Sequence, residues 1–158
     1  MHGVIRASLD ADALLSITAS ALADLERRFR AAGFSTELRL GDMDDPIGAV
    51  LTLHDEFENR VDLLVGIRGF DPQAFSRVID VTLDGEPLRF VGLEDFVAMK
   101  IFAGSPQDLS DAATALEVST APLDIDLLRR LSRRYGADTA RSLESVLAGL
   151  SRDSDPRR

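Results

Sequence analysis

The chain has 158 residues, of which 45% are apolar and 28% are charged, so its composition is that of one globular domain and excludes a disordered chain. Cysteine is absent, which excludes disulfides, thiolate metal sites and a cysteine nucleophile. The net charge of -9 argues against a protein that coats nucleic acid. No apolar run is long enough for a membrane helix and no signal peptide is recognisable, so we expect a cytoplasmic protein with no membrane partner.

The first third of the chain mixes strand and helix patterns. A run of small and apolar residues favours a strand over residues 9–17. Thr18 or Ser20 can cap a helix over residues 21–32, whose apolar positions recur at helical spacing. Strict alternation of apolar and polar residues then predicts a strand over residues 34–40.

Two antiparallel hairpins are expected next, because apolar runs flank a polar loop in one case and an Asp-Gly turn in the other. Between the hairpins, Asp71 followed by Pro72 predicts a short helix over residues 73–77. The predicted strands of the hairpins are residues 50–54 and 61–67, then residues 78–83 and 88–91.

From residue 93 onward the apolar period becomes helical. Gly104 and Gly136 are helix stops, and Ser105 with Pro106 opens a helix. The predicted helices are residues 93–103, 107–117, 124–135 and 138–149.

These patterns together predict an α+β protein with a mixed β-sheet flanked by helices and a C-terminal helical segment. We expect an α/β core over residues 1–92 and a helical region over residues 93–150 that packs on it. Residues 151–158 are polar and are expected to form a disordered tail.

Two aspartates near the N-terminus are the first candidate site residues. Asp10 and Asp12 are two positions apart, so on a strand they share one face. Neighbouring carboxylates repel each other and resist burial, unless a divalent cation lies between them. The alternative is an exposed strand start, where the two charges face water.

A third aspartate lies within an apolar strand. Asp62 is flanked by Val61, Leu63 and Leu64, and a carboxylate in such a run is costly unless it is paired or bound to metal. The alternative is an edge strand on which this acid faces water and prevents aggregation.

Lys100 is the single lysine of the chain and lies on the apolar stripe of its predicted helix. Such a lysine must extend to water or meet a carboxylate, and Asp108 and Asp111 on the next predicted helix are suitable partners. A structural ion pair and a contact with a substrate phosphate are both open interpretations.

Three stretches in order resemble the nucleotidyltransferase superfamily, which has the polymerase-β-like fold. RASLDAD (residues 6–12) matches the family element R-x-[ST]-x-D-x-D, and Asp62 in VDLL (residues 61–64) matches the third acid. GLEDFVAMK (residues 92–100) and QDLSD (residues 107–111) are similar to a region of the small bacterial branch related to AbiEii-type toxins.

This resemblance implies a nucleotidyltransferase-like sheet and a metal-dependent transfer of a nucleotide from an NTP to a protein or RNA hydroxyl, such as a tRNA end. The expected role is that of a toxin–antitoxin component with an antitoxin or another protein as partner. The resemblance assigns Mg²⁺ or Mn²⁺ to Asp10, Asp12 and Asp62, with Asp62 also helping to activate the hydroxyl. The implied nucleotide contacts are Arg6, Ser8 and Lys100.

One family element is not matched. The family has a G-[GS] pair on a helix before the D-x-D strand, whereas Gly3 has no second glycine or serine beside it. Either the true start lies upstream, or nucleotide binding is lost and the domain is a catalytically degenerate protein-interaction module. A third interpretation is an unrelated α+β domain whose acids are surface charges.

Overall fold

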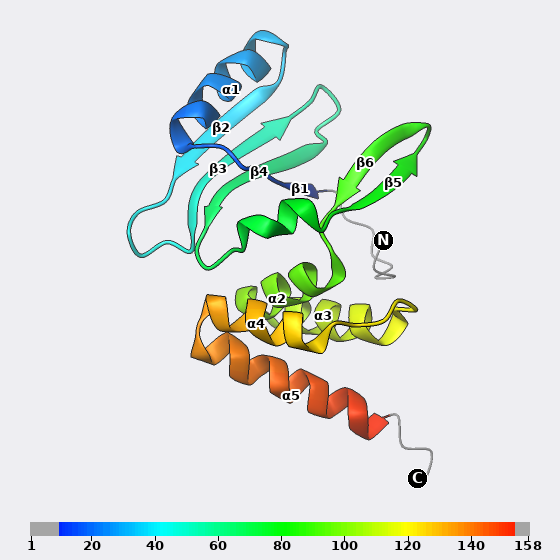
Figure 1. Ribbon diagram of the computed structural model, residues 1–158. Helices are drawn as coiled ribbons and strands as arrows, with labels where there is room; N and C mark the ends of the chain where they lie inside the picture. Colours follow the sequence, from blue (N-terminus) through cyan, green and yellow to red (C-terminus); the bar gives the residue numbers. More distant parts are fainter. Residues whose placement is uncertain (1–9, 154–158) are drawn as a thin grey trace. The chain divides into compact units, whose positions relative to one another are not determined.

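The computed structural model describes residues 10–153, with the backbone alone at residues 10, 19 and 151–153 (Figure 1). These residues form two compact units, which are residues 10–68, here called the sheet unit, and residues 69–153, here called the helical unit. The predicted α+β class is confirmed, because five α-helices in this range accompany a four-stranded mixed sheet and a two-stranded sheet. The sequence analysis divided the chain after residue 92 instead, and that division stays a prediction.

The sheet unit consists of four strands and one helix. Its elements are β1 (Asp10–Leu14), α1 (Ala19–Ala31), β2 (Ser35–Leu40), β3 (Ile47–His54) and β4 (Arg60–Ile67). The strand order is β1-β4-β3-β2, with β1 parallel to β4 and the other pairs antiparallel. β1 ends three residues before the predicted strand end at residue 17, and the Thr18 side chain then caps α1 by accepting a hydrogen bond from the Ala21 amide at 3.2 Å.

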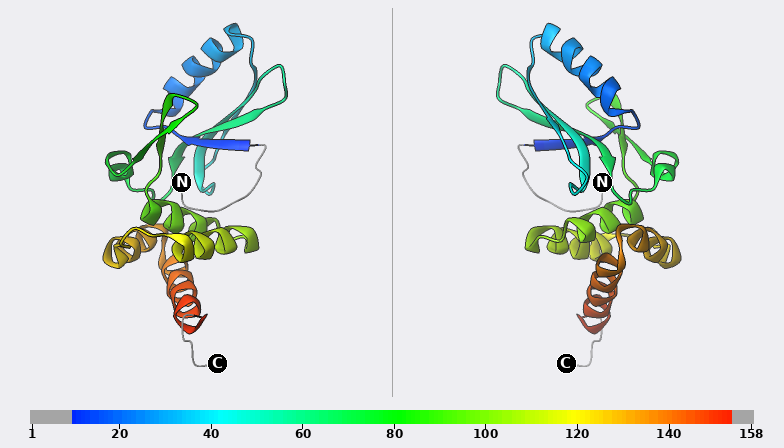
Figure 2. Two further views of the ribbon diagram at one scale, coloured as in Figure 1. Left: turned by 90° about the vertical axis from the view of Figure 1, so that its right-hand side faces the viewer. Right: turned by 90° about the vertical axis from the view of Figure 1, so that its left-hand side faces the viewer.

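One face of this sheet forms the core of the unit. Along β3 the side chains alternate between buried and half-buried, and Leu51 and Leu53 are among the buried ones. They pack with Leu22 and Phe29 of α1, which runs along one side of the sheet (Figure 2). Thr52, which lies between these two leucines, therefore belongs to the face opposite α1.

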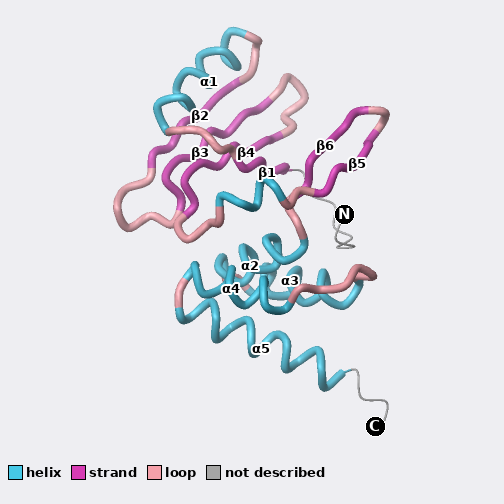
Figure 3. Tube along the Cα trace, in the orientation of Figure 1, coloured by secondary structure: helices cyan, strands magenta, loops and turns pink. Residues whose placement is uncertain are grey.

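The helical unit begins with a short 3₁₀ helix and a two-stranded hairpin, after which the chain is helical (Figure 3). Its elements are η1 (Pro72–Ser76), β5 (Ile79–Leu83), β6 (Glu86–Phe90), α2 (Leu93–Ala103), α3 (Pro106–Val118), α4 (Ile125–Tyr135) and α5 (Ala137–Asp153). The four α-helices enclose one apolar cluster that includes Val97, Leu128 and Leu143. α5 runs beyond its predicted end at residue 149, and no helix of the described range is long and apolar enough to cross a membrane.

Replacing Gly69 with alanine is expected to lower the free energy of unfolding by about 1–2 kcal/mol or more, because an L-residue resists the left-handed backbone conformation. Gly69 has φ +80°, and an added Cβ would lie 2.6 Å from the Arg134 carbonyl oxygen. Gly85 is the matched control, since its φ is +86° but nothing lies within 4 Å of an added Cβ. Chemical denaturation of both variants checks this prediction, and an equal loss in the two would contradict a steric contribution at Gly69.

Candidate functional site

The pairing of β1 with β4 brings two of the predicted site residues together. Asp12 is the register partner of Asp62 in this parallel pair, and Thr52 of β3 is the register partner of Asp62 on the other side. Register partners project from the same face of a sheet, and Thr52 belongs to the face opposite α1. Asp12, Thr52 and Asp62, with Arg60 two positions before Asp62, therefore define what we call the carboxylate face.

Asp62 is the most enclosed acid of this face, with 14% of its side chain exposed. Thr52 Oγ1 donates a hydrogen bond to Asp62 Oδ1 at 2.7 Å. The Arg60 guanidinium donates from Nε to Oδ1 at 3.2 Å and from Nη2 to Oδ2 at 2.8 Å. The cost of placing this carboxylate within an apolar strand is thus offset by one hydroxyl and one bidentate ion pair.

The N-terminal part of the predicted site is described only in part. Asp12 is exposed on β1, the edge strand of the sheet. For Asp10 the backbone alone is described, and this residue is the register partner of Arg60. Arg6 and Ser8, the predicted nucleotide contacts, lie outside the described residues.

The side chains of the carboxylate face fit a divalent cation by their chemistry. Asp12 and Asp62 offer carboxylate oxygens from adjacent strands, and hard cations such as Mg²⁺ choose such oxygens. Within the described residues, no three His, Cys, Asp or Glu side chains gather closely enough to hold a metal ion. Mg²⁺ does not need such a cage, because it is commonly held by one or two carboxylates together with water and substrate phosphates.

Lys100 lies in the helical unit, where the predicted partners are confirmed. Its Nζ lies 2.8 Å from Asp108 Oδ1 and 3.2 Å from Asp111 Oδ2, so two carboxylates of α3 hold one ammonium of α2. Burial acts to lower the pKa of Lys100, but the hydrogen bonds and charges of Asp108 and Asp111 outweigh burial and raise it. The structural ion pair is therefore present, and the role of Lys100 toward a phosphate stays a prediction.

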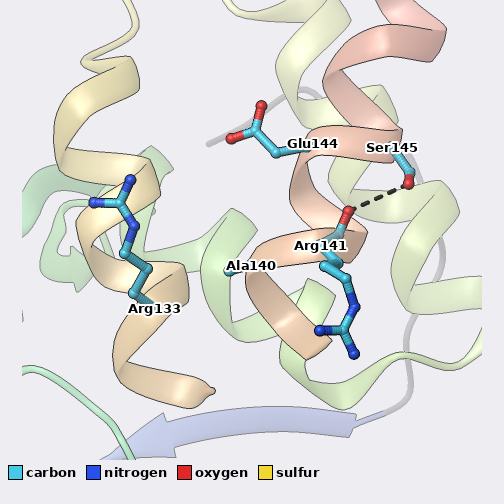
Figure 4. Close-up of a pocket in the computed structure, with 5 residues that line it drawn as sticks. All are labelled: Arg133, Ala140, Arg141, Glu144 and Ser145. Atoms are coloured by element: carbon cyan, nitrogen blue, oxygen red, sulfur yellow. Dashed lines mark hydrogen bonds between the residues drawn. The ribbon is translucent and has the colours of Figure 1, made fainter. Parts of the chain in front are cut away.

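A hollow of about 470 Å³ lies between α4 and α5 in the helical unit (Figure 4). Its lining is formed by Arg133, Ala140, Arg141, Glu144 and Ser145. The Ser145 hydroxyl is directed at the carbonyl oxygen of Arg141, to which it donates at 3.2 Å. None of the predicted site residues that the structure describes lines this hollow.

Two residues of the carboxylate face were missed by the sequence analysis. The sequence spacing could have placed Arg60 beside Asp62, because residues two apart on a strand share a face and Arg60 precedes Asp62 by two positions. No local pattern in the sequence indicates Thr52, since its contact with Asp62 depends on the register between β3 and β4.

The sequence matches no protein-family model, and no curated protein matches it either. Among solved structures, the chain is similar to an antigenic nucleotidyltransferase-like protein from Paracoccidioides brasiliensis, with a TM-score of 0.48 and 16% sequence identity. The similarity covers 93% of this chain and 71% of that chain. A likeness of this kind concerns the path of the backbone, whereas function depends on the side chains of a site.

Proposed function

We propose that this protein is a nucleotidyltransferase that uses Mg²⁺ or Mn²⁺ and transfers a nucleotide from an NTP to a hydroxyl group. The observation that carries the proposal is the side-by-side placement of Asp12 and Asp62 on the carboxylate face. Two carboxylates at one register position repel each other, and a cation between them removes this cost. The resemblance of residues 6–12 and 61–64 to the family elements supports the same assignment.

The proposed reaction forms a bond between the acceptor oxygen and the α-phosphorus and breaks the bond from that phosphorus to the pyrophosphate. A bound divalent cation supplies charge neutralisation at the attacking and leaving oxygens. Asp12, with Asp10 and Asp62, would hold that cation, and Asp62 would take the proton that leaves the hydroxyl. Thr52 orients the Asp62 carboxylate for these tasks through its hydrogen bond of 2.7 Å.

The proposal extends to the acceptor and the setting. A net charge of -9 disfavours extended contacts with nucleic acid, so the acceptor is a protein hydroxyl or a short RNA end such as that of a tRNA. Such a cytoplasmic enzyme suits a toxin–antitoxin component that a partner protein neutralises. Incubation with α-labelled NTPs, whole-cell RNA and protein identifies the labelled acceptor class.

Nucleotide binding is the first test. Thermal unfolding of the wild type with each of ATP, GTP, CTP and UTP, with Mg²⁺ or Mn²⁺ and with a chelator, is expected to show a metal-dependent rise for at least one nucleotide. A ligand at 100 times its dissociation constant adds about 2.7 kcal/mol, which raises the melting temperature by about 5–10 °C. Asp12→Asn is expected to abolish this rise, because it removes a charged oxygen ligand on an exposed strand.

Asp44→Asn is the matched control for this test, since it makes the same charge change at an exposed loop position of the sheet unit. It should keep the full nucleotide response. A response that is equal in the wild type, Asp12→Asn and Asp44→Asn would remove the carboxylate face from the site. A folded wild type whose melting temperature does not respond to any nucleotide would contradict the proposed activity.

One observation favours a second candidate function, a catalytically degenerate domain that binds a protein partner. The Arg60 guanidinium already pairs with Asp62, so the charge of this carboxylate is balanced without a metal. The same titration separates the two functions, because the degenerate domain would fold normally and give no metal-dependent shift.

A further inference from the structure

The bonds that Asp62 makes leave little room for a metal ligand. A carboxylate has about four lone-pair positions, and three of them accept hydrogen bonds here. Two are on Oδ1, from Thr52 Oγ1 and Arg60 Nε, and one is on Oδ2, from Arg60 Nη2. A cation that binds Asp62 through both oxygens must therefore take over positions that Arg60 holds.

Arg60 is built to be displaced more readily than Thr52. It is the first residue of β4, directly after the polar loop of residues 55–59, and 42% of its side chain is exposed. An ion pair with one partly exposed partner is weaker than a fully buried pair, and a long side chain at such a position can swing into water. Thr52 is half-buried in β3 and its short side chain has no comparable reach. Its hydrogen bond can persist while Oδ1 also binds a metal.

We propose that Arg60 is an internal counter-ion that competes with the divalent cation for Asp62, and that it sets how tightly the site binds metal. This inference rests on the proposed function. In the absence of metal, the guanidinium balances the charge that Asp62 brings to the carboxylate face. When a divalent cation binds, the guanidinium leaves Asp62, and its own positive charge is removed from the neighbourhood of the metal.

Removal of the guanidinium is expected to tighten metal binding. Arg60→Gln should lower the dissociation constant for Mn²⁺ by about three- to tenfold, as loss of one competing, partly exposed ion pair and of one repelling charge predicts. Arg60→Lys keeps the charge but cannot form the bidentate contact, so its dissociation constant should lie between those of the wild type and Arg60→Gln. The free Mn²⁺ signal in electron paramagnetic resonance measures binding without nucleotide or turnover.

Arg39→Gln is the matched control. Arg39 is an exposed arginine on the same sheet face, but it lies on β2, which is two strands away from β4. Arg39→Gln makes the same charge change as Arg60→Gln, so a general electrostatic effect of charge removal appears in both variants. A specific effect appears in Arg60→Gln alone, and thermal unfolding of each variant verifies that it is folded.

Each outcome bears on a different proposal. Tighter Mn²⁺ binding in Arg60→Gln than in Arg39→Gln supports the competition. If the wild type binds Mn²⁺ and Arg60→Gln binds it equally well or more weakly, the role of Arg60 is overturned and the proposed function stands. If neither the wild type nor Arg60→Gln binds Mn²⁺, and the nucleotide titration also shows no metal-dependent rise, the metal-dependent function fails and the role of Arg60 fails with it.

Discussion

Replacing Arg77 with methionine is expected to lower the free energy of unfolding by about 3–5 kcal/mol, because it leaves a buried carboxylate without its partner. Arg77 donates from Nε and Nη2 to the two oxygens of Asp95 at 2.9 and 2.8 Å, and from Nη2 to Asp71 Oδ2 at 3.0 Å. Only 3% of the Asp95 side chain is exposed. Water therefore cannot replace the guanidinium, and urea denaturation of the variant measures the loss.

Two further variants separate the loss of the ion pair from a general effect of mutation. Arg77→Met combined with Asp95→Asn removes the stranded charge, so part of the stability should return. Arg89→Met breaks the exposed Arg89–Asp80 pair, whose side chains are 77% and 79% exposed, and should change the melting temperature little. An Arg77→Met variant as stable as Arg89→Met would contradict the structural role assigned to this pair.

Local patterns predicted most elements of this fold. The hairpin of β5 and β6 follows from Asp84-Gly85, whose φ values of 51° and 86° are those of a tight turn between twisted strands. The start of β3 was predicted three residues too late, at residue 50 instead of Ile47. Gly48 lies in the strand beside Gly66, where an added Cβ would lie 3.6 Å from the Gly66 Cα.

The candidate site was predictable by residue type but not by arrangement. The sequence analysis identified Asp12 and Asp62 without knowing that they are register partners. That pairing is parallel and joins residues 50 positions apart in the sequence, and no local signal encodes such a register. The bond from Thr52 to Asp62 depends on register in the same way.

Two acids of the LED stretch that supported the family resemblance have structural contacts in the helical unit. Glu94 Oε1 accepts a hydrogen bond from the Asp124 amide at 2.9 Å, next to the start of α4. Asp95 pairs with Arg77, which joins the first turn of α2 to the end of η1. A sequence match at these positions therefore carries information about folding as well as about function.

Replacing Lys100 with methionine is expected to lower the free energy of unfolding at pH 7 by about 2–3 kcal/mol, since two partly buried carboxylates lose their cation. Only 6% of the Asp111 side chain is exposed, and Gln107 Nε2 still donates to Asp111 Oδ1 at 2.7 Å in the variant. Asp108 keeps the hydroxyl of Ser105 at 2.6 Å. Neither neutral donor replaces a positive charge. Lys100→Arg, which keeps the charge, should lose less.

The pH dependence of this loss identifies its cause. In the wild type burial acts to raise the pKa of Asp108, but Lys100 and Ser105 outweigh it and lower the pKa below 3.8. The stability from this carboxylate is thus present above pH 3.8 and is lost as the pH falls through the lowered pKa. The pKa of Lys100 is raised above 10.5, so its contribution is present below pH 10.5 and is lost as the pH rises through the raised pKa.

In Lys100→Met the sign at Asp108 reverses, because burial without a cation favours the protonated carboxyl. The penalty of the variant is therefore full near neutral pH and shrinks as acid protonates Asp108. Denaturation curves of wild type and variant at several pH values should converge below about pH 4. A gap that is constant from pH 3 to pH 7 would mean that lost apolar packing, and not the stranded charges, accounts for the destabilisation.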